Sequence, residues 1–404
     1  MKLMPDLVCL SLDNDVVVFS QEAQQIVVLS PSAALVFSKL QLGMAAAEIA
    51  QALANEAVVA QDEASRWVTT TLDALRSHGM LAGGPAQIIP STRTSAEDQS
   101  RTTRRIAKMP PFPTFESAAD GYYRLLGTSA LIRFAHLAQR RMVDAAIGHL
   151  ATDSCPAPAI VLDIYAVKLD DGQIRSNLYR NRAPVDYAAK LSFLGPIVKA
   201  ALWQSAVNAH DFLYYIHAGV VGTGEACILL PAPPGSGKSS LTAALSHSGF
   251  LYFTDEVALI ERETLKVPPV PLALCVKSTG WDLMARYYPE ISTLPTHRRT
   301  DGKVVRYMPP PHTESEAKRL RSAPVSHIFF PQYSEAEPPE LEPISRTEAL
   351  RGLMDECLAL RQQLTFDTVC QLVRWIAGID CYKLTFSSLD EAVGLIQKVV
   401  GFPS

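Results

Sequence analysis

The sequence predicts an α/β protein of two parts: a small N-terminal α+β module of winged-helix type, and a larger C-terminal domain built around a phosphate-binding loop. Three observations support this class. Residues 1–84 carry three short strand patterns followed by three helix patterns. The apolar run Cys227–Leu230 enters a turn rich in Pro and Gly that opens a helix pattern. A second apolar run, Phe250–Phe253, leads into the acidic pair Asp255 and Glu256.

These patterns divide the chain into three parts. The N-terminal module takes residues 1–84, a linker rich in Pro, Ser and Thr takes 85–115, and the C-terminal domain takes 116–404. Within the last part, 116–210 carry no catalytic motif, and 211–404 form the expected nucleotide-binding core. We expect a helix over 118–150, strands near 159–169 and 179–185, and a helix over 191–209.

Composition excludes several classes of function. The chain has 404 residues, 48% of them hydrophobic, and a net charge of −4, which argues against nonspecific binding to nucleic acid. Its seven cysteines are scattered and form no C-x-x-C pair, as is typical of a reducing compartment. No apolar run approaches 18 residues. We therefore expect a cytoplasmic protein with neither nucleic-acid nor membrane partners, and the sequence leaves a homo-oligomer open.

The N-terminal module begins with strand patterns at 7–12, 15–19 and 25–29. Ser30 or Ser32 then caps a helix, and two further helices are expected near 45–54 and 62–78. The strand and helix start IVVLSPSAA (26–34) and the ending LDALRSHGML (72–81) resemble the PqqD-like family. The resemblance implies an exposed sheet edge to which the leader of a ribosomally made precursor peptide adds as a strand. A winged helix used for DNA or dimer contacts is the alternative, and the few cations disfavour DNA.

The loop chemistry rests on the run Gly235, Ser236, Gly237, Lys238, Ser239 and Ser240. Glycines let successive N–H groups turn toward one anion at a helix N-terminus. Lys238 is expected to reach the β- and γ-phosphates of a nucleotide, and the Ser239 hydroxyl to ligate Mg²⁺. The pattern departs from the usual one at Ala232, which stands where the first Gly belongs. A glycine-rich turn that only caps a helix is the alternative interpretation.

The acidic pair supplies the second half of the site. Strands that run parallel end at the same edge of a sheet, so Asp255 and Glu256 are expected to face the bound phosphates. One carboxylate can hold Mg²⁺ and the other can accept a proton from an attacking hydroxyl. A solvated turn is the alternative for such a pair.

The spacing of His217-Ala218, the loop PAPPGSGKSS and Thr254-Asp255-Glu256 resembles the HPr serine kinase/phosphorylase group, over about residues 205–400. The resemblance implies a P-loop kinase domain with a mixed sheet, related to phosphoenolpyruvate carboxykinase. It also implies that His217 handles a proton or phosphate, and that Lys303 and Arg306 neutralise charge on the transferred group. Lys277 is a further candidate, and Arg298 and Arg299 stay unassigned.

These observations together predict a kinase that uses ATP and Mg²⁺ to phosphorylate a Ser or Thr hydroxyl of a peptide or small protein. The N-terminal module would present the substrate, most simply a precursor peptide. Asp255 is the preferred base, with Glu256 and Ser239 around the metal, and the sequence leaves the reverse assignment open. Alternatives are a nucleotide-gated peptide binder, a kinase of a small-molecule hydroxyl, and a phosphorylase or ATP hydrolase.

Overall fold

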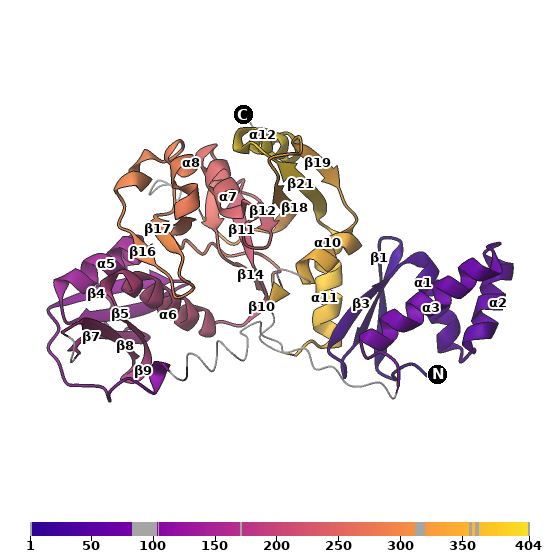
Figure 1. The fold of residues 1–404 in the computed structure, drawn as a ribbon, viewed down its shortest axis with the longest axis horizontal. Helices are drawn as coiled ribbons and strands as arrows, with labels where there is room; N and C mark the ends of the chain where they lie inside the picture. The colour runs from indigo at the N-terminus through magenta and orange to yellow at the C-terminus, as the bar shows by residue number, and fades with distance from the viewer. Residues whose placement is uncertain are drawn as a thin grey trace. The chain divides into compact units, whose positions relative to one another are not determined.

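The computed structural model describes residues 2–82, 103, 105–169, 172–311, 320–354, 358–359 and 363–402. The chain forms two compact units (Figure 1). Unit 1 comprises Met1–Arg93 and Pro343–Tyr382, and unit 2 comprises Thr94–Glu342 and Lys383–Ser404. The expected mixed α/β class is confirmed, with several sheets, some of which combine parallel and antiparallel strands. The unit bounds differ from the predicted domains, because 343–382 group with the N-terminal residues.

The N-terminal part of unit 1 contains the three strands and three helices that the sequence predicts. The strands form an antiparallel sheet in the order β1-β2-β3. Ser30 caps the first helix by accepting a hydrogen bond from the Ala33 N–H at 3.4 Å. A buried cluster that includes Val36, Leu53 and Leu75 fills the space between helices and sheet. The elements are β1 (Leu7–Leu12), β2 (Asp15–Ser20), β3 (Gln25–Leu29), α1 (Pro31–Gln41), α2 (Ala46–Glu56) and α3 (Gln61–Ser77).

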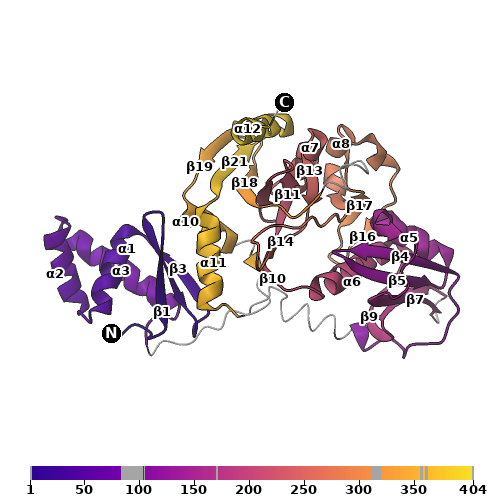
Figure 2. The same cartoon turned by 180° about the vertical axis from the view of Figure 1, so that it is seen from behind.

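A C-terminal segment completes unit 1. It carries α10 (Arg346–Gly352) and α11 (Phe366–Ala377), and α11 lies beside β1 (Figure 2). The Gln24 side chain exchanges two hydrogen bonds with the backbone of Leu364, at 2.8 and 3.0 Å. Arg351 donates to the carbonyl oxygen of Val28 at 3.1 Å. The module predicted from residues 1–84 therefore has a partner contributed from more than 300 residues further along the chain.

Unit 2 begins with a six-stranded sheet in the order β6-β4-β5-β7-β8-β9. α5 and α6 cover one face, and their apolar side chains form a core with those of the strands. The predictions of a strand at 159–169 and a helix at 191–209 are confirmed. The elements are β4 (Ala119–Leu125), β5 (Thr128–Phe134), α5 (Leu137–Ile147), β6 (Ala151–Thr152), β7 (Ile160–Lys168), β8 (Ile174–Arg180), β9 (Ala183–Ala188) and α6 (Leu194–Asn208).

Two sequence predictions need correction in this region. The single strand expected near 179–185 is wrong, because residues 181–182 form the turn that joins β8 to its antiparallel partner β9. The helix expected over 118–150 is wrong for its first half, which forms the hairpin β4–β5. Its apolar side chains alternate, so that Ala130, Ile132 and Phe134 all face the core, a period of two that belongs to a strand. Most of the expected linker lies outside the described residues. Its described part packs on the sheet, where the Tyr179 hydroxyl donates to the Pro110 carbonyl at 3.0 Å.

The central sheet of unit 2 runs in the order β13-β11-β12-β18, followed by β21 and β19. Two smaller pairings flank it: β10 with β14, and a three-stranded sheet in the order β15-β17-β16. Within the described part of the chain, no helix is both long and apolar enough to cross a bilayer. The strands are β10 (Phe212–Ile216), β11 (Ala218–Gly222), β12 (Cys227–Pro231), β13 (Leu251–Thr254), β14 (Ala258–Glu261), β15 (Leu274–Lys277), β16 (His297–Arg298), β17 (Val304–Met308), β18 (Val325–Tyr333), β19 (Glu340–Pro343) and β21 (Asp380–Phe386); the main helices are α7 (Lys238–His247), α8 (Trp281–Ala285) and α12 (Leu389–Val400).

Candidate functional site

Three segments of the chain meet at one edge of the central sheet. β12 and β13 each pair antiparallel with β11, so they point in the same direction and end where β11 begins. His217 precedes β11, the loop with Gly235 and Gly237 follows β12, and Asp255 follows β13. The edge shared by the loop and the acidic pair, expected from the sequence, therefore exists, with β11 between the two strands.

The glycine-rich loop turns tightly into α7. Gly235 and Gly237 have φ angles of 102° and 85°, in the left-handed region that side chains rarely adopt. A Cβ atom at Gly237, the N-cap of α7, would also lie 2.8 Å from the Phe386 ring. Ala232 is buried and does not adopt a positive φ, so its replacement of the usual Gly places no strain on the backbone. The loop therefore presents its N–H groups at a helix N-terminus.

Lys238 and His217 form a buried pair at this edge. The Lys238 ammonium lies 2.7 Å from His217 Nε2, and the lysine is only 6% exposed. Burial and, to a smaller extent, the nearby ammonium lower the pKa of His217 to about 4, so the ring is neutral and accepts this hydrogen bond. Gly219 permits the contact, because a Cβ atom there would lie 2.1 Å from Thr242 Oγ1 and would push α7 away from β11.

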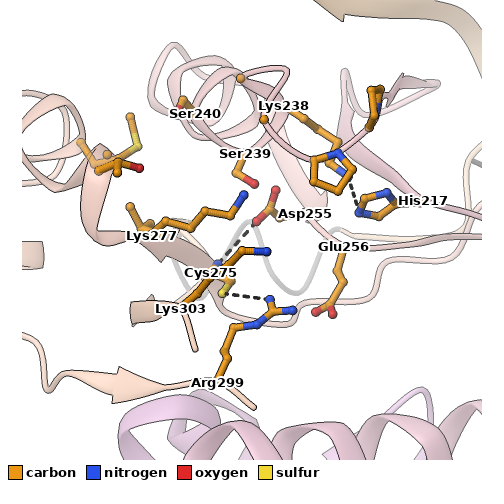
Figure 3. Close-up of a pocket in the computed structure, with 18 residues that line it drawn as sticks. His217, Lys238, Ser239, Ser240, Asp255, Glu256, Cys275, Lys277, Arg299 and Lys303 are labelled. Atoms are coloured by element: carbon orange, nitrogen blue, oxygen red, sulfur yellow. Dashed lines mark hydrogen bonds between the residues drawn. The ribbon is translucent and has the colours of Figure 1, made fainter. Parts of the chain in front are cut away.

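Asp255 lies beside the Ser239 hydroxyl in a buried position (Figure 3). Its Oδ2 accepts a hydrogen bond from the Cys275 N–H at 3.4 Å, and its buried Oδ1 has no hydrogen-bond partner. Burial raises the pKa of Asp255 to about 6, and the Lys238 ammonium opposes that rise. A buried carboxylate with one oxygen free of hydrogen bonds and a serine hydroxyl beside it is well suited to share a cation.

Glu256 points away from the loop, toward Arg299 (Figure 3). Its carboxylate lies 2.5 Å from the Lys199 ammonium, which α6 contributes. The lysine side chain is 8% exposed and the glutamate side chain 50% exposed. The Lys199 charge lowers the pKa of Glu256, despite an opposing effect of burial, so this carboxylate is ionised at neutral pH. Sequence reasoning missed Lys199, whose only signal is a single cation in an apolar helix.

These groups surround a cavity of about 340 Å³. Among the described residues, the basic side chains that line it are Lys238, Lys277, Arg299 and Lys303. Figure 3 shows the amines of Lys277 and Lys303 pointing toward the acidic pair. Of the predicted site residues, those that line the cavity are His217, Gly235, Gly237, Lys238, Ser239, Ser240, Asp255, Glu256 and Lys303.

Two predicted residues are placed differently. Ser236 belongs to the loop but does not line the cavity, and its carbonyl accepts a hydrogen bond from the Tyr333 N–H at 3.2 Å. Arg306 lies outside, because its guanidinium stacks 4.0 Å from the centre of the Trp281 ring and donates to the Ile291 carbonyl. Arg299, which the sequence left unassigned, occupies the cavity instead.

The residues present fit a magnesium ion held jointly with a nucleotide. In the described part of the chain, no group of three or more His, Cys, Asp or Glu is arranged to hold a metal. Mg²⁺ commonly takes one or two protein ligands and completes its shell with phosphate oxygens and water. The Ser239 hydroxyl and the unpartnered Oδ1 of Asp255 provide such a pair.

Comparison with known proteins identifies the N-terminal part of the chain. Residues 15–81 match the family model described as coenzyme PQQ synthesis protein D (PqqD), so the expected PqqD domain is present. No curated protein matches the chain. Among solved structures, TbiB1 in complex with the TbiA(beta) leader peptide is 25% identical; the match covers 21% of this chain and 99% of that one, with a TM-score of 0.20.

Proposed function

We propose that this protein is a kinase that transfers the γ-phosphoryl group of ATP to a Ser or Thr hydroxyl of a peptide, most simply a ribosomally made precursor peptide. One observation carries the proposal: a glycine-rich loop at a helix N-terminus, four cations and two carboxylates converge on one cavity. Cations and oriented N–H groups stabilise the charge of a transferring phosphoryl group, and a carboxylate can accept the hydroxyl proton.

The two carboxylates take different roles in this proposal. Asp255 and Ser239 hold Mg²⁺, which neutralises phosphate charge when bound. Glu256 accepts the proton of the acceptor hydroxyl; the acceptor oxygen bonds to the γ-phosphorus, the bond to the β-phosphate oxygen breaks, and ADP leaves. This reverses the assignment preferred from the sequence, because Ser239 faces Asp255 and Glu256 points away from the loop.

The cations complete the machinery. Neutral His217 accepts a hydrogen bond from Lys238 and so directs the ammonium, which would bind the phosphates beside the loop. Lys277, Arg299 and Lys303 line the same cavity and would offset the charge that spreads over the phosphoryl oxygens.

The PqqD domain supports a peptide as the acceptor. Residues 15–81 match the PqqD family. The resemblance implies a module that binds the leader of a precursor peptide, and such a peptide can add as a strand to an exposed sheet edge. β3 is the last strand of its sheet, and the carbonyl of Val28 accepts a hydrogen bond from Arg351 rather than from a strand. We propose that the leader pairs with this edge and replaces the Arg351 contact.

Phosphoryl transfer is tested by intact mass of candidate precursor peptides after incubation with the full-length protein, ATP and Mg²⁺. We expect a gain of one phosphate, reduced about a hundredfold or more in rate by Lys238→Ala. Lys266→Ala, which removes an exposed lysine after β14, is the matched control and should keep the full rate. Wild-type rates in Lys238→Ala would refute the kinase proposal, and tight binding of both ATP and peptide without any transfer would favour the nucleotide-gated binder.

Leader binding is tested at β3 without truncating the chain. Val28→Pro removes an N–H from the outer edge, where proline is tolerated, and should weaken peptide binding about tenfold. Val28→Thr keeps the N–H and should bind as the wild type does. Equal affinity of both variants would exclude strand addition at this edge, and free serine accepted as readily as peptide would favour a small-molecule kinase.

A further inference from the structure

Unit 2 contains a second cavity of about 340 Å³ next to the first. Glu256 and Arg299 line both cavities, so these two side chains form the boundary between them. The second cavity is built mainly from α6, with contributions from β9 and β17. None of the loop residues 233–240 lines it, so the nucleotide phosphates belong to the first cavity and the second remains open to another molecule.

Glu256 is held at this boundary by Lys199. The lysine is buried in α6, contacts the Glu256 carboxylate at 2.5 Å and lies 5.3 Å from the centre of the Tyr307 ring. The contact fixes the Glu256 side chain between the two cavities, which it lines together with Arg299. It therefore keeps the carboxylate next to whatever occupies the second cavity.

The walls of the second cavity indicate the class of molecule that fits. Ile197, Ala201 and Trp203 supply an apolar side, while Gln204 and Thr300 supply hydrogen-bonding groups. Its volume is at the low end of the range for small-ligand pockets, so it admits one or two residues of an extended chain.

We infer that the second cavity is the acceptor site, and that it takes a hydroxyl-bearing residue of an extended peptide together with an apolar neighbour. This inference rests on the proposed kinase function. The acceptor hydroxyl faces Glu256, which takes its proton as the oxygen bonds to the γ-phosphorus in the first cavity. The neighbouring side chain packs on Trp203, and Lys199 acts as a positioning residue for Glu256.

The inference gives the segment 116–210 a role that its sequence did not reveal. α6 and β9 lie in this segment and form most of the second cavity, whereas the first cavity is formed by residues 217–303. Acceptor selectivity is thus carried by a different part of the chain from nucleotide binding. Changes at the α6 positions that line the cavity, other than Lys199, should therefore alter peptide recognition and leave nucleotide binding unchanged.

The test fills the second cavity without touching a charged group. Ala200 lines it and is exposed on α6, so Ala200→Trp occupies the space with little cost to folding. Ala209→Trp, at the exposed end of the same helix, is the matched control. The probes are short synthetic peptides with one central Ser and varied neighbours, assayed with ATP and Mg²⁺. Nucleotide affinity is measured separately with ADP.

We expect Ala200→Trp to raise the peptide KM about tenfold or more and to weaken the preference for an apolar neighbour, with ADP affinity changed less than about twofold. Ala209→Trp should match the wild type. Gln204→Trp, a second exposed lining position, serves if Ala200→Trp does not fold. An unchanged peptide KM in both filled variants overturns the inference alone, whereas a wild-type protein that phosphorylates no peptide overturns the kinase proposal and this inference together.

Discussion

Replacing Gly219 with Ala tests whether the site depends on the close approach of α7 to β11. The Cβ atom would lie 2.1 Å from Thr242 Oγ1, which is 1.3 Å inside the limit of ordinary contact at 3.4 Å. Thr242 is fully buried, and its hydroxyl donates to the Lys238 carbonyl at 2.9 Å, so it cannot rotate away at no cost. α7 must therefore shift, and it carries Lys238 and Ser239 with it.

The expected cost follows from this overlap. Overfilling a well-packed core destabilises by about 1–3 kcal/mol, so Gly219→Ala should lower the free energy of unfolding by that amount. Thr242→Ala alone removes one buried hydrogen bond and should cost about 1 kcal/mol. Because it also removes the clashing oxygen, the double variant should be more stable than Gly219→Ala, with a coupling of about 1 kcal/mol or more.

The assay is urea unfolding of the full chain, with hydrogen exchange of α7 as a local readout, and ADP affinity by calorimetry. Exchange of α7 amides should accelerate in Gly219→Ala and return toward wild type in the double variant. ADP affinity should fall about tenfold in the single variant. A Gly219→Ala protein within about 0.5 kcal/mol of wild type would refute the packing argument.

Three further predictions follow from buried charge and from unit 1. Burial raises the folded-state pKa of Asp255 to about 6, so its contribution to stability is largest below the unfolded value near 4 and is lost as pH rises through 6. Asp255→Asn should therefore raise the free energy of unfolding at pH 8, measured in urea, by about 1–3 kcal/mol while abolishing phosphoryl transfer. A variant as stable as the wild type at pH 8 would contradict this. Lys199→Met removes the charge that lowers the pKa of Glu256, so the acidic limb of the pH–rate profile should move to higher pH. Lys199→Arg keeps the charge and should leave the profile in place. Identical pH–rate profiles for Lys199→Met and the wild type would exclude Glu256 as the base. Gln24→Ala removes two hydrogen bonds to Leu364, so limited proteolysis should cut residues 363–382 faster than in the wild type. Gln21→Ala, a change at an exposed position, is the control. Equal cleavage rates in the two variants would show that these hydrogen bonds do not hold the segment.

Local patterns in the sequence predicted much of this structure. The strands and helices of the N-terminal module follow from period-two and helical spacing, and the PqqD match agrees with that assignment. The loop with Gly235 and Gly237 was recognisable because only glycine adopts its φ angles without strain. The shared edge of the loop and the acidic pair followed from strand direction alone.

Local patterns failed where a residue's neighbours are distant in sequence. The sequence predicts a helix over 118–150, but residues 119–134 form the hairpin β4–β5, whose alternate side chains pack into the core with α5 and α6. The sequence favours Arg306 as a cation of the site and leaves Arg299 unassigned. The pairing of β15 with β17, with Trp281 close by, turns Arg306 away from the cavity and leaves Arg299 in it.

The sequence by itself determined which groups are available: a glycine-rich loop that opens a helix, a carboxylate pair, a set of cations and a PqqD domain. These depend on residue types at short spacing, so they are visible without a fold. Only the tertiary structure decided how the groups divide the work. It brought Lys199 of α6 to Glu256, 57 residues away, and joined 343–382 to the N-terminal module, because charge pairing and burial depend on distance in space and not on distance along the chain.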